Sequence, residues 1–216
     1  MISSIQFITQ ENPVTHNHQD IVREACDAGI DWVQFRAKNY HFDHWVAEAK
    51  IIRKICDTYK STFIVNDNVE VALESAADGV HLGKNDTDPR DARKMMGDGF
   101  IIGATANTFE DIESLADKGV DYIGLGPFRF TTTKNKLSPV IGINGYRDIL
   151  LKCDKANIKI PVIAIGGITI SDIPELMQTG IHGIAVASLI NNSSSRKNTI
   201  EKLLKAINHA KVEIGK

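Results

Sequence analysis

Three stretches of this sequence repeat one pattern: ACDAGIDWVQF (residues 25–35), LADKGVDYIGL (115–125) and LMQTGIHGIAV (176–186). Each begins with residues suited to the end of a helix, passes through a glycine, and continues into a short apolar run. A fourth stretch, ESAADGVHL (74–82), is a variant of the pattern. The repeated junction predicts stacked units in which a helix leads into a strand, and therefore a parallel sheet covered by helices.

Eight short runs have the composition of buried strands, and segments with helical spacing separate them. Val46, Ala49, Ile52 and Ile55 recur at intervals of three, and Thr108 is a typical helix start. Eight such units in 216 residues predict a closed (β/α)₈ barrel, a TIM barrel, as one domain spanning residues 1–216. The alternative, an open doubly wound sheet, is less suited to eight units, and no G-x-G-x-x-G follows the first run. The predicted strands are residues 5–9, 31–36, 62–66, 79–83, 100–104, 122–126, 161–166 and 183–188.

Composition excludes several classes of protein. The chain has 25 Lys and Arg against 27 Asp and Glu, a net charge of −2, which gives no support for a nucleic-acid or membrane-surface partner. No apolar run approaches the roughly 18 residues of a membrane helix, and the start, MISSIQFITQ, lacks the features of a signal peptide. Three widely spaced cysteines indicate reduced thiols in a cytoplasmic protein. Homo-oligomerisation is not readable from the sequence.

In a (β/α)₈ barrel the reacting groups lie at the carboxyl ends of the strands and in the loops that follow. Polar and small residues stand at these positions after seven of the eight predicted strands. They are Gln34, Arg36 and Lys38; Asn66 and Asp67; Asp86; Thr105; Thr131, Thr132, Thr133 and Lys134; Gly166 and Gly167; and Ala187 and Ser188.

These residue types favour phosphorylated ligands. Two carboxylates on neighbouring strand ends, Asp67 and Asp86, suit Mg²⁺ completed by water and phosphate oxygens, although either residue alone fits a helix N-cap equally well. Gly167 in a glycine pair suits close approach of a phosphate to the backbone, with a tight turn as the alternative. The loop GPFRFTTTKNK (126–136) is a phosphate-binding loop or an ordinary Thr-rich surface loop. Taken together, these positions predict a diphosphate and a monophosphate bound side by side.

The histidines do not form a metal-binding pattern. His16, His18, His41 and His44 have no Cys or carboxylate placed to complete a zinc set, so we interpret them as solvated side chains. His81 lies within a predicted strand, and we interpret it as a hydrogen-bonded histidine facing the barrel interior.

Over nearly its whole length the chain resembles the thiamine phosphate synthase family. The matching motifs are Gln34-x-Arg36-x-Lys38, Asn66-Asp67, ADGVHLG followed by Asp86, GPFRFTTTK, PVIAIGGI and GIAVAS, in this order and spacing. The resemblance implies a Mg²⁺-dependent transferase that joins a pyrimidine diphosphate to a thiazole phosphate, plain or carboxylated, and releases pyrophosphate. It also implies a dissociative mechanism with a carbocation-like methylene and no protein nucleophile.

The resemblance implies a role for each position. The pyrimidine diphosphate is bound by Gln34, Arg36, Lys38, Asn66, Thr105 and Lys134, of which Arg36, Lys38, Thr105 and Lys134 are the catalytic residues. Asp67 and Asp86 bind Mg²⁺. The thiazole phosphate is bound by Thr131, Thr132, Thr133, Gly167, Ala187 and Ser188.

Four positions depart from the family pattern: Thr105 stands for Ser, Asn107 for His, Lys84 for Gln and Thr132 for Pro. None of these changes removes a predicted metal ligand or Lys134. Two alternatives share the scaffold: a thiazole tautomerase, which lacks much of the diphosphate machinery, and a non-catalytic phosphate-binding regulator. Because Asp67, Asp86 and Lys134 are all present, the synthase is favoured.

Overall fold

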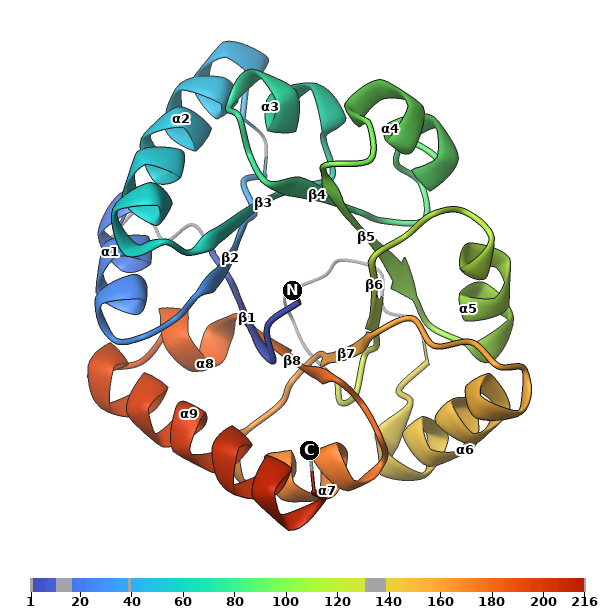
Figure 1. Ribbon diagram of the computed structural model, residues 1–216. Helices are drawn as coiled ribbons and strands as arrows, with labels where there is room; N and C mark the ends of the chain where they lie inside the picture. The colour runs from blue at the N-terminus through green and yellow to red at the C-terminus, as the bar shows by residue number, and fades with distance from the viewer. Residues whose placement is uncertain (1, 11–16, 39, 131–138, 216) are drawn as a thin grey trace.

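The computed structural model describes residues 2–10, 17–38, 40–130 and 139–215, and its eight parallel strands form a closed barrel (Figure 1). The strands follow one another around the ring in sequence order, and β8 pairs with β1 to close it. The closed ring confirms the predicted TIM barrel and excludes the open sheet. The strands are β1 (Ile5–Ile8), β2 (Trp32–Phe35), β3 (Thr62–Asn66), β4 (Gly79–Leu82), β5 (Ile101–Ala106), β6 (Tyr122–Leu125), β7 (Val162–Ile165) and β8 (Gly183–Val186).

Helices cover the outside of the ring (Figure 1). Most of the buried apolar side chains form one core cluster that includes outward-facing strand residues and inward-facing helix residues. The helices are α1 (His18–Asp27), α2 (Phe42–Tyr59), α3 (Val69–Glu74), α4 (Pro89–Met96), α5 (Phe109–Ala116), α6 (Gly142–Lys155), α7 (Ile173–Gln178), preceded by a 3₁₀ turn η1 (Ile170–Asp172), α8 (Ser188–Asn191) and α9 (Arg196–Glu213).

The repeated junction has a structural explanation. Its glycines, Gly29, Gly119 and Gly180, have φ angles of 104°, 72° and 96°, the left-handed conformation that ends a helix and that side chains disfavour. In two of the junctions the aspartate before the strand then bonds the preceding unit: Asp121 Oδ2 accepts from the Ile102 amide and from Arg93, both at 2.7 Å. The pattern therefore encodes a helix end and a link to the neighbouring strand.

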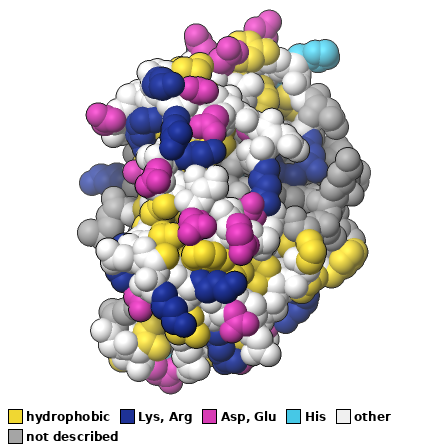
Figure 2. All heavy atoms as spheres, turned by 90° about the vertical axis from the view of Figure 1, so that its right-hand side faces the viewer, with side chains coloured by type: hydrophobic (Ala, Val, Ile, Leu, Met, Phe, Trp, Pro, Cys, Tyr) yellow, Lys and Arg dark blue, Asp and Glu magenta, His cyan; other side chains and the backbone are white. Residues whose placement is uncertain are grey.

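Asp78, in the variant junction, makes the same link. Its Oδ2 accepts from the Phe63 amide at 2.6 Å and from Arg53 at 2.7 Å. Lys118–Asp88 adds a further ion pair between neighbouring units at 2.8 Å. On the face shown in Figure 2, positive and negative side chains are interspersed, so this face has no broad field of one sign.

The barrel interior has its own small core. Ile8, Trp32, Ile64, Tyr122, Ile163 and Ala185 form it. The Trp32 and Tyr122 rings meet edge to face with their centroids 4.8 Å apart. Two glycines leave space for the Tyr122 and His81 rings. A Cβ at Gly103 would lie 2.1 Å from Tyr122 Cζ, and a Cβ at Gly124 would lie 3.0 Å from His81 Cε1.

One histidine prediction is wrong. His18 is buried, with 2% of its surface exposed, and its ring lies edge-on to Phe35 with the centroids 4.9 Å apart. Burial lowers its pKa from 6.5 to about 4, so the ring packs as a neutral aromatic group. The burial of His18 at the start of α1 keeps its ring neutral. Its polar neighbours in the chain do not indicate this burial. His16 lies outside the described residues, and among those described no helix is long and apolar enough to span a membrane.

Adding a methyl group at Gly103 should destabilise the barrel. The Gly103→Ala substitution forces the buried Tyr122 ring to move and should lower the free energy of unfolding by about 1–3 kcal/mol. The matched control is Gly99→Ala, since nothing lies within 4 Å of a Cβ there. Denaturant unfolding of both variants measures the difference. Equal midpoints would show that the interior tolerates the added volume.

Candidate active site

The predicted site residues that the structure describes all lie at one end of the barrel, because the carboxyl ends of parallel strands share that end. Arg36 and Lys38 follow β2 directly, and Asp67 follows β3. Asp86 lies in the loop after β4, Gly167 in the loop after β7, and Ala187 and Ser188 follow β8. Asn66 is the last residue of β3, and Thr105 lies near the end of β5.

Arg36, Lys38 and Asp67 form one electrostatic group. Burial lowers the pKa of Arg36, and the nearby Asp67 carboxylate only partly opposes this effect. The pKa of Lys38 is also lowered, by burial and by repulsion from Arg36, again with partial compensation from Asp67. Two cations and a carboxylate therefore act on one another at this mouth. Two positive charges close together suit the binding of an anion.

Asp67 and Asp86 are not helix caps. Asn68 caps α3, accepting from the Val71 amide at 2.8 Å, and Asp88 caps α4, accepting from the Arg90 amide at 2.9 Å. The N-cap alternative is therefore wrong for both candidate metal ligands.

Both aspartates are anchored to the end of β4. The Asp67 amide donates to the His81 carbonyl at 2.8 Å, and Asp86 Oδ2 accepts from the Gly83 amide at 2.6 Å. Asp67 has a φ of 70°, a left-handed conformation that is uncommon for a residue other than glycine and that is found at functional sites. The residues thus share the mouth, as predicted; their binding of Mg²⁺ stays a prediction. Among the described residues no group of three or more His, Cys, Asp or Glu side chains could hold a metal ion.

Gln34 lies deeper than the other predicted residues. It is 2% exposed, and its Nε2 donates to Gln6 Oε1 at 3.1 Å inside the barrel. Thr105, at the upper end of β5, is half-buried, and its hydroxyl lies 3.1 Å from His81 Nε2. The prediction that His81 is a hydrogen-bonded interior histidine is confirmed, because it is 8% exposed and its Nδ1 lies 3.0 Å from the Tyr122 hydroxyl.

The loops after β6 and β7 pack against each other through Gly166 and Gly167. The Phe128 amide donates to the Ile165 carbonyl at 2.8 Å, and the Arg129 amide donates to Gly166 at 2.9 Å. A Cβ at Gly166 would lie 2.8 Å from Pro127 Cα, so this close approach requires a glycine. The Gly-Gly pair thus has a packing role at the mouth, whatever else it binds.

Arg129 and Asp172 fasten the same two loops. The guanidinium donates from Nη1 and Nη2 to the two Asp172 oxygens at 2.9 and 2.8 Å, and from Nη1 to the Gly167 carbonyl at 2.8 Å. The Arg129 hydrogen bond, together with bonds from Thr169, lowers the pKa of Asp172 to about 2. The pair thereby holds the first residues of the loop after β6 beside Gly167.

The region after β8 is held by Asn191. Its Oδ1 accepts from the Gln10 amide at 3.1 Å, and its Nδ2 donates to the carbonyls of Ile8 and Ala187 at 2.9 and 2.8 Å. The side chain joins the end of β1 to the start of α8, which places Ala187 and Ser188 at a fixed point of the mouth.

The comparisons with known proteins agree with this geometry. A family model described as thiamine monophosphate synthase matches residues 5–190. The chain belongs to the thiamine monophosphate synthase family. It is 48% identical over 203 residues to the thiamine-phosphate synthase of Flavobacterium johnsoniae, covering 94% of this chain and 95% of that protein. It is also 48% identical over 186 residues to the thiamine-phosphate synthase of Phocaeicola vulgatus, covering 86% and 89%.

A solved structure of a thiamine phosphate pyrophosphorylase from Pyrococcus furiosus superposes with a TM-score of 0.84 at 32% identity, covering 96% of each chain. The resemblance that the sequence motifs carry is therefore confirmed. This member of the thiamine monophosphate synthase family is a transferase of thiamine biosynthesis.

Not every position that the family pattern emphasises lies in the described part of the chain. Thr131, Thr132, Thr133 and Lys134 lie outside it. Two of the departures have clear partners: Lys84 Nζ pairs with Asp111 Oδ2 at 2.6 Å, and the Asn107 side chain donates to the Gly126 carbonyl. Both residues join neighbouring loops at the mouth, so the departures have a structural role.

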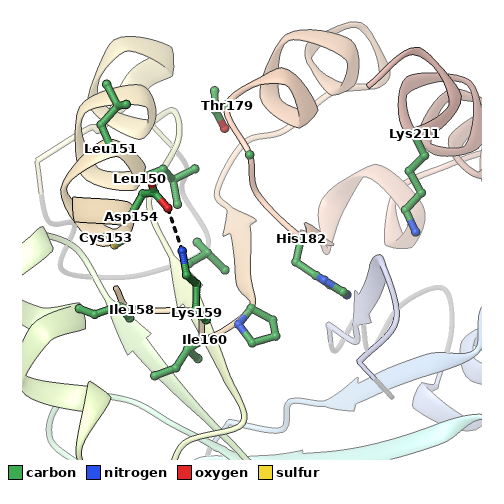
Figure 3. Close-up of a pocket in the computed structure, with 13 residues that line it drawn as sticks. Leu150, Leu151, Cys153, Asp154, Ile158, Lys159, Ile160, Thr179, His182 and Lys211 are labelled. Atoms are coloured by element: carbon green, nitrogen blue, oxygen red, sulfur yellow. Dashed lines mark hydrogen bonds and ion pairs between the residues drawn. The ribbon is translucent and has the colours of Figure 1, made fainter. Parts of the chain in front are cut away.

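A pocket of about 590 Å³ lies away from these residues (Figure 3). It borders the end of α6, the segment that leads into β7, and His182 just before β8, which is the amino end of the barrel. Several of its polar groups bond within the protein: Lys159 Nζ donates to Asp154 Oδ1 at 2.8 Å, and His182 Nε2 lies 2.8 Å from the Ile2 carbonyl. The candidate active site is therefore identified by its residues and not by this pocket.

Acid should remove the contribution of the Arg129–Asp172 pair. The pKa of Asp172 is about 2 in the folded protein against an ordinary 3.8, so the pair stabilises above about pH 4, and this contribution disappears as the pH falls to 2. Since the Arg129 side chain is 47% exposed, solvent screening limits the contribution to at most about 2 kcal/mol. The Asp172→Asn variant should be less stable at pH 7 and equal to wild type near pH 2.

Unfolding curves across this range measure the effect. Asp154→Asn, which removes an exposed ion pair with Lys159, is the control and should change little at any pH. A difference between Asp172→Asn and wild type that does not vary between pH 7 and 2 would contradict the assigned pKa.

Proposed function

We propose that this synthase joins 4-amino-2-methyl-5-(diphosphooxymethyl)pyrimidine to 4-methyl-5-(2-phosphoethyl)thiazole, or to the carboxylated form of this thiazole, and that the reaction depends on Mg²⁺. The observation that carries the proposal is the group of Arg36, Lys38, Asp67 and Asp86, delivered by three successive strands to one mouth. A pair of cations beside two carboxylates suits a diphosphate together with a divalent cation.

Arg36 and Lys38 bind the diphosphate of the pyrimidine substrate in this proposal. Burial lowers the pKa of both side chains, and phosphate oxygens beside them would favour their charged forms. A planar guanidinium also presents paired N–H donors that match phosphate oxygens. Asn66 and Gln34, on the strands beside them, contribute amide groups to the same substrate.

Asp67 and Asp86 fit a Mg²⁺ site. One or two carboxylates completed by water and substrate phosphates are the usual ligand set of this ion. Because Asp86 uses Oδ2 for the Gly83 amide, its carboxylate is oriented while keeping lone pairs for a cation. When bound, Mg²⁺ supplies charge neutralisation for the diphosphate.

The thiazole phosphate is assigned to the opposite side of the mouth, near Gly167, Ala187 and Ser188. Backbone N–H groups at the start of α8 have no acceptor within the helix, which suits a phosphate. The threonines 131–133 and Lys134 belong to this proposal through the family resemblance alone.

The reaction requires positioning and electrostatics. The C–O bond between the pyrimidine methylene and the diphosphate breaks with its electron pair leaving on pyrophosphate, and the thiazole nitrogen supplies the pair for the new C–N bond. Arg36, Lys38 and Lys134 stabilise the charge that develops on the leaving group. Holding two reactants together is worth about 7–11 kcal/mol at best, so no protein nucleophile is needed.

Asp67→Ala should reduce turnover by on the order of 100-fold or more while leaving the fold intact, because it removes the ligand and the counter-charge of Arg36. The measurement is pyrophosphate release with both substrates, with Mg²⁺ and with EDTA in its place. Activity that requires both substrates and Mg²⁺ supports the synthase; conversion of a single thiazole phosphate without metal supports the tautomerase alternative.

The matched control is Asp88→Ala, in the loop after β4 that also carries Asp86. It removes the α4 cap and should cost about 1 kcal/mol of stability with turnover retained. Near-normal turnover of Asp67→Ala in the presence of Mg²⁺ would defeat the metal assignment.

A further inference from the structure

A chain of hydrogen bonds runs through the barrel interior to the mouth. Gln34 Nε2 donates to Gln6 Oε1 at 3.1 Å, and Gln6 Nε2 donates to the Tyr122 hydroxyl at 3.0 Å. The Tyr122 hydroxyl lies 3.0 Å from His81 Nδ1, and His81 Nε2 lies 3.1 Å from Thr105 Oγ1. The first four side chains are buried, and Thr105 is half-buried at the upper end. The proposed function uses Gln34 and Thr105 and leaves the three side chains between them unassigned.

The direction of the hydrogen bonds follows from the donors. The Tyr122 hydroxyl oxygen accepts a hydrogen bond from Gln6 Nε2 at 3.0 Å. A phenol has one hydrogen, and burial raises the pKa of Tyr122, so this hydrogen stays on the oxygen. With the Gln6 amide donating to the phenol oxygen, the hydroxyl gives its own hydrogen to His81 Nδ1, which lies 3.0 Å away. A neutral imidazole that accepts at Nδ1 carries its hydrogen at Nε2.

This tautomer determines what Thr105 can do. The Nε2–H of His81 donates to Thr105 Oγ1, so the hydroxyl hydrogen of Thr105 points elsewhere. Thr105 lies near the end of β5, and a β-branched side chain has few χ1 rotamers, which limits where the hydrogen is directed. The hydroxyl therefore acts toward the mouth as a donor.

We propose that His81, held as the Nε2–H tautomer by Tyr122, is a positioning residue that makes Thr105 a hydrogen-bond donor to an acceptor atom of the pyrimidine diphosphate. The proposal rests on the proposed function, because Thr105 is assigned there to this substrate. It accounts for the interior glycines, since Gly103 and Gly124 leave the space that the Tyr122 and His81 rings occupy. It is also compatible with Thr in place of Ser, because both side chains supply the hydroxyl that the chain of hydrogen bonds uses.

The tautomer is tested without any substrate. In ¹⁵N-histidine-labelled protein, the His81 resonances, assigned by comparison with His81→Asn, should show hydrogen on Nε2 and none on Nδ1. Tyr122→Phe should abolish this preference, whereas Tyr146→Phe, which removes the hydroxyl of another buried tyrosine, should leave the His81 signals unchanged. Hydrogen on Nδ1 in the wild-type protein overturns the proposal.

Kinetics test the link to the substrate. His81→Asn keeps an amide near Tyr122 but does not reach Thr105, and it should lower kcat/KM for pyrophosphate release roughly 10- to 100-fold, as should Thr105→Val. His81→Gln places an amide donor near the position of Nε2 and should recover most of this loss. The double variant His81→Asn/Thr105→Val should be no worse than either single variant, because both remove the same donor.

The outcomes separate the two proposals. Losses that multiply in the double variant, or that follow the loss of thermal stability, indicate a structural role for His81 and overturn the inference. The expected tautomer together with full activity of Thr105→Val overturns the link to the substrate, while the proposed function still stands. Wild-type protein that releases no pyrophosphate from the two substrates overturns the proposed function, and the labelled spectra remain a test of the tautomer.

Discussion

The closure of the ring is the constraint on which the rest of the structure depends. The Ile184 amide donates to the Ser4 carbonyl at 2.9 Å where β8 meets β1, and Gly183 permits this contact, since a Cβ there would lie 2.3 Å from the same oxygen. Because the strands are parallel and the ring is closed, every carboxyl end faces one mouth. Side chains separated by more than 100 positions, such as Arg36 and Ser188, are thereby held on one rigid rim. Closure also seals the interior, so polar groups there depend on partners inside the barrel; among the described residues Gln6, Tyr122 and His81 have them, whereas Trp32 Nε1 has none.

The sealing of the interior explains the hydrogen-bond network inside this barrel. Buried amide, phenol and imidazole groups each cost free energy unless they are hydrogen-bonded, and a fully satisfied network fixes their orientation. Gln6, Tyr122 and His81 meet this requirement with bonds of about 3 Å, in space that glycines on β5 and β6 leave open. The interior is thus a rigid support for the strand ends as well as a core. Side chains at the strand ends are therefore held more precisely than side chains on loops alone would be.

The fold could be predicted because its signal is local and repeated: a glycine ends the helix at three junctions, and Asp78 and Asp121 link two junctions to the neighbouring strand. Even the variant follows the rule, since Ala76, with a φ of 52°, takes the left-handed position there. Residue types at strand ends also predicted which described side chains share the mouth. The roles of Asp67 and Asp86 could not be decided from sequence, because a cap and a metal ligand use the same residue type, and only the positions of Asn68 and Asp88 exclude capping. The interior partners of Tyr122 and the Arg129–Asp172 pair depend on register around the ring, which no local pattern encodes.

The distribution of charge at the mouth connects this rigidity to the chemistry. Burial of Arg36 disfavours its charged form, an effect that Asp67 opposes only in part, and folding tolerates this cost because the rest of the barrel is well packed. Such a site is preorganised: its dipoles and charges do not have to reorient when a diphosphate arrives or when negative charge develops on it. Asp67 adds to this preorganisation through a left-handed backbone conformation held by the His81 carbonyl. His81 thus contacts Asp67 through its backbone and Thr105 through its ring, so a single residue of β4 orients groups on both neighbouring strands.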